Sequence, residues 1–391
     1  MRTTTRRAPH VVRADNDSGE LAEELPRIIN HSASGCSAMP PTPSVEPLVP
    51  MVESRDGGLL VAQWWPGERA IGPATTAATT GIEDKLTIVL AARTHDEGGF
   101  PRVPLLVRSL TKFLAYEAVL EMLVVCPDLD VVTFQRLDAL QAMRWPLRVV
   151  PDSALLSLSE DNFERVTPAE EWAVGGGRGA NYRMQMLTKI SVANLVRSDF
   201  YLVLDCDVLA TRRTQFADLV RGGKAVYAAK PFEYERHRRT WWAAADRILQ
   251  ARGCVTDRRG SVIGVTPAIL STNISRGVMA RVGALHSGRA WDESLFRLRL
   301  DEGLDWTEYT LYWTAACVLG LAEKLHTPPH GVELYEESAF EWGAWQEWDA
   351  ARAFGDDSFV FTVIQSIGGA PPDWVAEQVE PYLKVNDSRR G

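Results

Sequence analysis

Two aspartates separated by one residue, Asp205 and Asp207, follow an uninterrupted apolar run at residues 200–204. An unpaired carboxylate is costly in a low-dielectric core, so the run predicts a buried strand that ends before the acids. Residues two apart in a strand point to the same side, so both carboxylates are expected to converge. Two such oxygen ligands suit Mg²⁺ or Mn²⁺, which bind one or two carboxylates together with substrate phosphates. The alternative is that one aspartate caps a turn and the other is solvated.

The elements that position this pair begin at residue 86. An apolar, β-branched run at 86–94 predicts a strand buried on both faces, 103–117 has helical spacing, and 119–128 predicts a second buried strand. This strand–helix–strand unit favours a parallel sheet with right-handed crossovers. Such sheets bind ligands at the carboxyl ends of their strands, which is where the acidic pair is expected. Further strands are expected within residues 145–155, 225–229, 262–270 and 356–367, and further helices within 175–196 and 306–323.

The composition separates a leader from one folded domain. Residues 1–80 are rich in proline and poor in aromatic side chains, so we expect a disordered, low-complexity leader followed by an α/β domain over 81–385. The net charge of -9 argues against general nucleic-acid binding, and no apolar run approaches the length of a transmembrane segment. The five cysteines have no paired spacing and predict reduced thiols in a cytoplasmic protein. Arginines near the start leave organelle targeting open as an alternative.

Three segments resemble the GT-A glycosyltransferases: residues 85–96, 182–212 and 306–318. More narrowly, they resemble a large, poorly characterised family of predicted glycosyltransferases. Its members pair an R-x-Q-x-x-x-K helix with a strand ending in D-x-D, and carry a downstream S/T-E-Y motif. The resemblance extends over about residues 85–370, and the motifs occur in the same order. Cys206 departs from the family's usual small residue inside D-x-D.

The resemblance implies a Rossmann-like nucleotide-diphospho-sugar transferase domain, with a mostly parallel central sheet and helices on both faces. It implies a divalent cation, Mn²⁺ or Mg²⁺, on the D-x-D motif. It also implies transfer of a sugar from a UDP- or GDP-linked donor to a hydroxyl group of a glycan, peptide or small-molecule acceptor. Inversion and retention of configuration both stay open.

The resemblance also assigns roles on the donor side. Asp205 and Asp207 would hold the cation and the diphosphate, while Arg93, at the end of the first strand, and Asp96 would meet the nucleotide. Gln185 and Lys189 would bind the donor as well; they lie four residues apart and share one helical face. The alternative for Gln185 and Lys189 is an exposed polar stripe.

Glu308, in the T-E-Y motif, is the candidate catalytic carboxylate. It would take the proton from the acceptor hydroxyl in an inverting reaction, or stabilise the positively charged sugar in a retaining one. The alternative is structural: Asp305 as N-cap and Glu308 as the third helical residue fit a capping box. His330 is a candidate third metal ligand, because such folds sometimes use a histidine near the carboxyl end.

Other functions stay open on the sequence alone. A haloacid-dehalogenase-type phosphatase also places D-x-D after an apolar strand and would use Asp205 as its nucleophile. However, Leu209 stands where that family has Thr or Val, and the motif does not open the domain. A sugar-nucleotide pyrophosphorylase would need a glycine-rich loop after the first strand, and the chain lacks one. A non-catalytic carbohydrate-binding protein is compatible with the 13 tryptophans.

Overall fold

The computed structural model describes residues 52–53, 59–60, 84–96, 98–158, 178–231, 239–251, 261–263, 266–302, 304–335 and 345–384. The chain divides into two compact units, Met1–Thr75 and Thr76–Gly391. In the first unit, strands β1 (Val52–Glu53) and β2 (Leu59–Leu60) pair antiparallel. The disordered leader expected over residues 1–80 lies almost entirely outside the described residues and stays a prediction.

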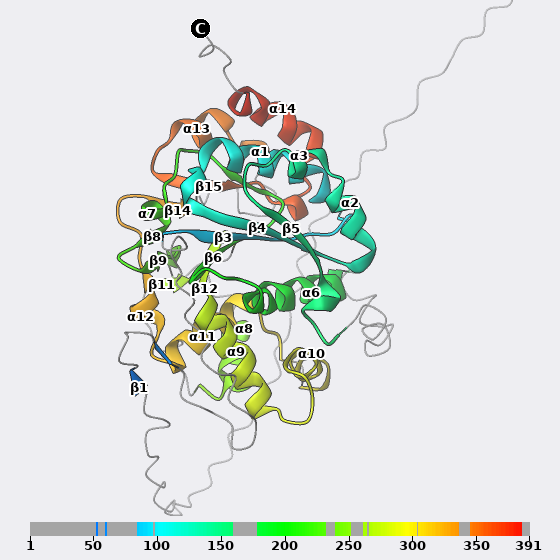
Figure 1. The fold of residues 1–391 in the computed structure, drawn as a ribbon, viewed down its shortest axis with the longest axis vertical. Coiled ribbons are helices and arrows are strands. Elements are labelled where there is room, and N and C mark those ends of the chain that lie inside the picture. The colour runs from blue at the N-terminus through cyan, green and yellow to red at the C-terminus, as the bar shows by residue number, and fades with distance from the viewer. Residues whose placement is uncertain are drawn as a thin grey trace, which may run out of the picture. The chain divides into compact units, whose positions relative to one another are not determined.

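Five strands form the central sheet of the second unit, in the order β12–β6–β3–β4–β5 (Figure 1). They are β3 (Leu86–Ala91), β4 (Val119–Cys126), β5 (Leu147–Pro151), β6 (Phe200–Leu204) and β12 (Ala268–Ser271). Neighbouring strands are parallel except for β12, which pairs antiparallel with β6. The predicted α/β fold with a mostly parallel central sheet is confirmed.

Side chains that alternate along one strand enter two different hydrophobic cores, as strand geometry requires. Val89 and Val203 pack under one group of helices, whereas Leu90 and Leu202 pack under another. Figure 1 shows the two groups on opposite faces of the sheet. The first group is α6 (Arg178–Ser191), α8 (Arg239–Leu249), α9 (Thr272–Leu285), α10 (Trp291–Glu302) and α11 (Glu308–Val318); the second is α1 (Val103–Phe113), α2 (Val131–Gln135) and α3 (Asp138–Gln141). Burial on both faces explains the continuous apolar runs in the sequence.

A second, three-stranded sheet begins almost directly after β6. Its strands are β7 (Val208–Ala210), β14 (Glu333–Tyr335) and β15 (Phe359–Val363), with β15 in the middle. Helices α13 (Ala350–Gly355) and α14 (Pro372–Leu383) supply most of the core that contacts Leu209 of β7. Residues 205–207 are therefore the link between the two sheets.

The remaining described elements are short. The strands are β8 (Val220–Arg221), β9 (Lys224–Val226), β10 (Ala229–Pro231), β11 (Ser261–Ile263) and β13 (His326–Thr327); β8, β9 and β13 form one small sheet, and β10 pairs with β11. The helices are α7 (Phe216–Leu219) and α12 (Ala322–Leu325), with 3-10 turns η1 (Phe100–Arg102), η2 (Tyr116–Ala118), η3 (Asp128–Asp130), η4 (Asp152–Ala154), η5 (Val192–Asn194), η7 (Trp345–Glu347) and η8 (Ser366–Gly368). None of the described helices has the length and apolar composition needed to cross a membrane.

Two predicted helices are shorter in the structure, for local backbone reasons. The helix expected over residues 103–117 ends at Phe113, because Leu114 takes an extended conformation. The helix expected over 306–323 ends two residues before Gly320, whose φ of +65° lies in the left-handed region. Glycine adopts that region without a Cβ penalty and commonly follows the end of a helix.

The cysteines differ from the expectation of uniformly reduced thiols. Cys126 and Cys206 are free and buried, whereas Cys317 is disulfide-bonded. The expectation is therefore wrong for Cys317. An odd, scattered set of cysteines has no spacing from which a pairing can be read.

Strand β6 lies inside the central sheet and leads directly into the acidic pair, so its burial can be tested by mutation. Leu202 is fully buried, so Leu202→Ala should lower the free energy of unfolding by about 2–5 kcal/mol through lost burial and the cavity left behind. Denaturant unfolding followed by circular dichroism measures this change. Leu129→Ala is the matched control: Leu129 is 84% exposed, and its loss should change stability by about 0.5 kcal/mol or less. Equal losses of unfolding free energy in the two variants would contradict the burial of Leu202.

Candidate active site

A buried lysine joins the acidic pair to a third carboxylate. The Nζ atom of Lys189 lies 2.8 Å from Oδ1 of Asp205 and 3.0 Å from Oε1 of Glu308. The side chains of Lys189 and Glu308 are each 2% exposed, and that of Asp205 is 28% exposed. These residues come from α6, from the link after β6 and from the first turn of α11. Three segments of the chain thus meet at one ammonium group, and Glu308 lies 119 residues from Lys189 in the sequence.

The surroundings of Lys189 keep this buried side chain charged. Burial alone would lower the pKa of Lys189, but the charge of Asp205 opposes it, with further contributions from Tyr309 and Glu308. The pKa of Lys189 is therefore raised well above its ordinary value. The ammonium also lies 5.5 Å from the ring centre of Tyr309, a cation–π distance. Lys189 is consequently a cation at neutral pH.

Gln185 and Lys189 share a helical face, as their spacing predicts, and that face meets the strand ends. Nε2 of Gln185 donates to the carbonyl of Ala91 at 3.0 Å, and lies 3.5 Å from Oδ1 of Asp205. The alternative of an exposed polar stripe is wrong, because Lys189 is buried and Gln185 is half-buried.

Glu308 is the first residue of α11, and the predicted capping box is wrong. The N-cap is Thr307, whose hydroxyl accepts from the backbone N–H of Thr310 at 3.2 Å. Asp305 instead accepts a hydrogen bond from Nε1 of Trp241 at 2.9 Å. Threonine is a good N-cap residue and lies directly before Glu308, so it leaves this carboxylate free to pair with a lysine.

The two oxygens of Glu308 have different environments. Oε1 accepts from Lys189, while Oε2 is buried and has no hydrogen-bond partner in the described part of the chain. Burial raises the pKa of Glu308; the neighbouring charge and hydrogen bond of Lys189 oppose this increase. A buried oxygen without a partner is costly for stability, which makes Oε2 a candidate contact for a ligand.

Asp205 and Asp207 lie in the turn between the two sheets, beyond the last residue of β6. The expectation that strand alternation orients both carboxylates is therefore wrong, because neither aspartate belongs to a strand. The turn nevertheless keeps them close: the charge of Asp205 is one of the two main causes that raise the pKa of Asp207. Cys206, between them, is buried and belongs to the core under α1.

Asp207 is held by a different segment, at the end of the second sheet. Its Oδ2 accepts from the backbone N–H of Ser366 at 2.9 Å, in the turn after β15. Burial and the charge of Asp205 raise the pKa of Asp207 to about 6, although the Ser366 N–H and Arg102 both oppose this increase. Asp207 therefore gives up its proton less readily than an ordinary aspartate.

Arg102 is a buried cation that the sequence did not reveal. It ends η1, is 1% exposed, and donates to the carbonyls of Ile364 and Ala370. Burial lowers its pKa, while the charges of Asp207 and Asp96 raise it. Arg102 thus fixes the segment that carries the Ser366 N–H and adds positive charge beside the acidic pair. An arginine in a short turn with no repeated spacing gives no signal of such a role.

Asp96 and Arg93 lie on the loop that follows β3. Oδ1 of Asp96 accepts from the backbone N–H of Gly99 at 2.9 Å. Any Cβ at position 99 would lie 2.1 Å from Oδ2 of Asp96, so only glycine permits this arrangement. A guanidinium nitrogen of Arg93 lies 3.9 Å from Oδ2 of Asp152, after β5. Both predicted nucleotide contacts are therefore at the carboxyl edge of the sheet, and their donor contacts stay predictions.

The carboxylates of Asp205 and Asp207 are oxygen ligands of the type that Mg²⁺ and Mn²⁺ bind together with substrate phosphates. Oδ1 of Asp205 forms the ion pair with Lys189, whereas Oδ2 makes no hydrogen bond or ion pair with a described residue. Within the described stretches, no three His, Cys, Asp or Glu side chains are grouped to hold a metal ion, so substrate and water would supply the other ligands. The cluster has an excess of two negative charges when every group is ionised: carboxylates Asp96, Asp205, Asp207 and Glu308 against cations Lys189 and Arg102.

His330 is not brought into such a group with Asp205 and Asp207. It is exposed, between β13 and β14, and its backbone carbonyl accepts from Arg221 at 3.0 Å. The predicted third metal ligand therefore has no support from the geometry.

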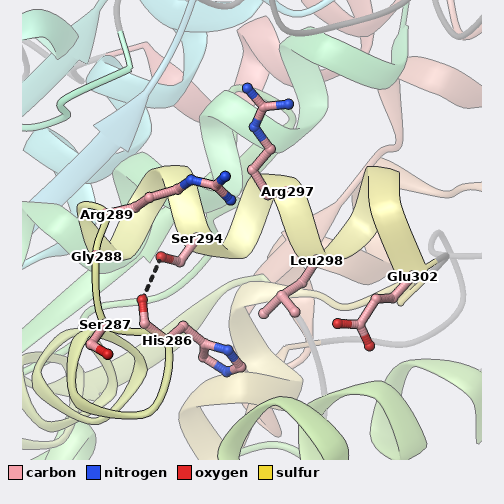
Figure 2. A pocket seen from close by; sticks show the side chains of 8 residues that line it. All are labelled: His286, Ser287, Gly288, Arg289, Ser294, Arg297, Leu298 and Glu302. Atoms are coloured by element: carbon pink, nitrogen blue, oxygen red, sulfur yellow. Dashed lines mark hydrogen bonds between the residues drawn. The ribbon is translucent and has the colours of Figure 1, made fainter.

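A pocket lies where α9 leads into α10, and it is separate from the acidic pair (Figure 2). It is lined by His286, Ser287, Gly288, Arg289, Ser294, Arg297, Leu298 and Glu302. Both arginines approach Glu293, at 3.5 and 4.0 Å, and Glu302 pairs with Arg247 at 2.8 Å. No residue of the acidic cluster lines this pocket, so its ionic groups do not contribute to the site at β6.

Comparison with known proteins gives a family and several solved structures. The model of a family described as "Family of unknown function (DUF6492)" matches residues 83–387. The apo form of mouse xyloside xylosyltransferase 1 is similar at a TM-score of 0.36 and 10% identity, over 71% of this chain and 97% of that one. The glycosyltransferase GlyE of Streptococcus pneumoniae TIGR4 is similar at a TM-score of 0.33 and 14% identity, over 72% of this chain and 54% of that one. The comparison with curated proteins finds no match.

The raised pKa of Asp207 predicts a pH-dependent gain in stability for Asp207→Asn. Between about pH 4 and pH 6 the folded protein keeps a proton that the unfolded chain has released, so wild-type stability falls as pH rises through this window. Without added metal, Asp207→Asn should therefore have a higher Tm than the wild type at pH 8. The difference should shrink at pH 4.5. Differential scanning calorimetry at the two pH values measures it.

The control is Asp357→Asn, at an exposed aspartate, which should raise Tm at neither pH. A Tm for Asp207→Asn below that of the wild type at pH 8 would contradict the electrostatic description of the site.

Proposed function

The chain belongs to this family of unknown function, and we propose that it is a glycosyltransferase that moves a sugar from a nucleotide-sugar donor to an acceptor hydroxyl. One observation carries the proposal. The aspartates 205 and 207 leave the carboxyl end of a central strand in a mostly parallel sheet and lie within one cluster with Lys189, Glu308 and Arg102. Open α/β sheets bind nucleotides at this edge.

Asp205 and Asp207 are the residues proposed to hold Mn²⁺ or Mg²⁺. When bound, the ion would neutralise the charge that develops on the departing nucleoside diphosphate. The excess of negative charge in the cluster favours a dication, and the two carboxylates leave positions for phosphate oxygens. Arg93, Asp96 and Gln185 are proposed to contact the donor, because all three lie at or near the end of β3.

Glu308 is proposed to act on the acceptor. Its Oε1 is fixed by Lys189, while its Oε2 is buried without a partner among the described residues and would accept a hydrogen bond from an acceptor hydroxyl that reaches it. The pKa of Glu308 is raised by burial, and a carboxylate with a raised pKa is a better base. In a retaining reaction, the same carboxylate would stabilise the positively charged sugar. Both mechanisms use the same side chain.

The donor class should be revealed by ligand-dependent stabilisation. We expect one of UDP, GDP or CDP, or a sugar conjugate, to raise the wild-type Tm only when Mn²⁺ is present. At roughly 100 times Kd the ligand stabilises the fold by about 2.7 kcal/mol. Asp207→Asn should lose the Mn²⁺-dependent shift while it remains folded, because it removes one of two proposed carboxylate ligands. Thermal-shift measurement over the nucleotide panel tests both statements.

Two controls separate this function from its alternatives. The wild type should not hydrolyse p-nitrophenyl phosphate with Mg²⁺, whereas a phosphatase with Asp205 as nucleophile would. A carbohydrate-binding protein without turnover would be stabilised by a free sugar, with neither nucleotide nor cation. An undiminished Mn²⁺-dependent shift in Asp207→Asn counts against the metal assignment.

Glu308→Gln should retain donor binding and lose turnover. Glutamine keeps an oxygen that can accept from Lys189 but cannot take a proton, so the rate should fall by about 10²–10⁴-fold. The measurement is release of nucleotide from the donor found in the panel, with the Mn²⁺-dependent thermal shift as the control for donor binding. A variant with full turnover would show that Glu308 serves only to hold Lys189.

A further inference from the structure

Lys189 binds one of the two oxygens of Asp205, and no described residue binds the other. The ammonium is 2.8 Å from Oδ1. Nε2 of Gln185 donates to the same oxygen, at 3.5 Å. Oδ2 makes no hydrogen bond or ion pair with a described residue, and it lies on a side chain that is 28% exposed. The carboxylate is therefore held with one oxygen toward the protein.

The structure also fixes the position of Lys189. Its ammonium has a second carboxylate partner in Glu308, at 3.0 Å, and lies over the ring of Tyr309. Its backbone carbonyl accepts from the hydroxyl of Tyr201, the second residue of β6, at 3.0 Å. Withdrawal of Lys189 from Asp205 would leave two carboxylates beside each other with less compensating charge, which is costly in a buried site.

Asp207 repeats this arrangement with a neutral donor. Its Oδ2 is bound by the Ser366 N–H at 2.9 Å, and the segment that carries this group is held by buried Arg102. Each aspartate thus has one oxygen engaged by the fold. Carboxylates that offer one oxygen suit ions that require near-octahedral geometry, such as Mg²⁺. Ca²⁺ takes six to eight oxygens and often binds both oxygens of one carboxylate.

We propose that Lys189 is a positioning residue that makes Asp205 a one-oxygen ligand and so makes the site selective for Mn²⁺ and Mg²⁺ over Ca²⁺. The proposal rests on the proposed function, because it assumes a cation at the acidic pair. Partners that orient metal ligands typically contribute about 10–100-fold to metal affinity. Part of that contribution should here appear as discrimination between ions, because Lys189 restricts how Asp205 binds.

The test compares Kd for Mn²⁺ and for Ca²⁺ by isothermal titration calorimetry, in the presence of the nucleoside diphosphate that stabilises the wild type. The informative variant is the double substitution Lys189→Met with Glu308→Gln, which removes one positive and one negative charge and so keeps the net charge. Its matched control is Glu308→Gln alone, in which Lys189 still binds Asp205. Circular dichroism establishes that each variant is folded.

We expect the wild type to bind Mn²⁺ more tightly than Ca²⁺, and Glu308→Gln to keep the ratio of the two Kd values. In the double variant, the preference for Mn²⁺ should fall by about tenfold, because Asp205 is free to offer both oxygens. A folded double variant with the wild-type ratio would overturn the proposal. A wild type that binds no Mn²⁺ would overturn the metal assignment itself, and the two failures are thus distinguishable.

A second measurement tests the coordination of Asp205 without the double variant. In the wild type with Mn²⁺ bound, infrared difference spectra should show carboxylate bands of one-oxygen coordination only. Bands of two-oxygen coordination, lost in Asp205→Asn, would overturn the proposal even if the double variant does not fold.

Discussion

The ammonium of Lys189, buried between Asp205 and Glu308, is the interaction on which the site depends. It joins a helix on one face of the sheet, the turn that leaves the central strand, and the start of a second helix. To break a buried ion pair by removing one partner typically costs about 3–5 kcal/mol, because the other charge loses its compensation. The position of each carboxylate is therefore coupled to the packing of all three segments.

The link between the two sheets explains why the acids can be both close together and only partly exposed. Residues 205–207 leave one sheet and enter the next within a single turn, so each aspartate is held from a different side. Lys189 holds Asp205 from the helical face, and the Ser366 N–H, supported by Arg102, holds Asp207 from the second sheet. Two carboxylates placed together in this way raise the pKa of Asp207 and create a demand for positive charge, which a dication would meet.

The sequence predicts the sheet well, because its strands are mostly apolar runs and β6 is an uninterrupted one. It also predicts that Gln185 and Lys189 share a face. It also places Asp205 at the end of β6. The contact between Lys189 and Glu308 could not be predicted, because 119 residues separate them. The spacing of Glu308 from Asp305 suggested a local helix cap instead. The roles of Arg102 and the Ser366 N–H were equally hidden, because a buried guanidinium and a backbone amide leave no pattern in the sequence. Tertiary contacts, more than local propensity, decide these parts of the site.

The most direct test of the central claim, that the two acids hold a cation for a nucleoside diphosphate, is anomalous scattering from a crystal soaked with Mn²⁺ and the stabilising nucleotide. The account predicts a manganese peak beside Oδ2 of Asp205 and next to Asp207, with the diphosphate as a further ligand and Lys189 still bound to Oδ1. An ordered nucleotide bound elsewhere, with no manganese between these carboxylates, would contradict it.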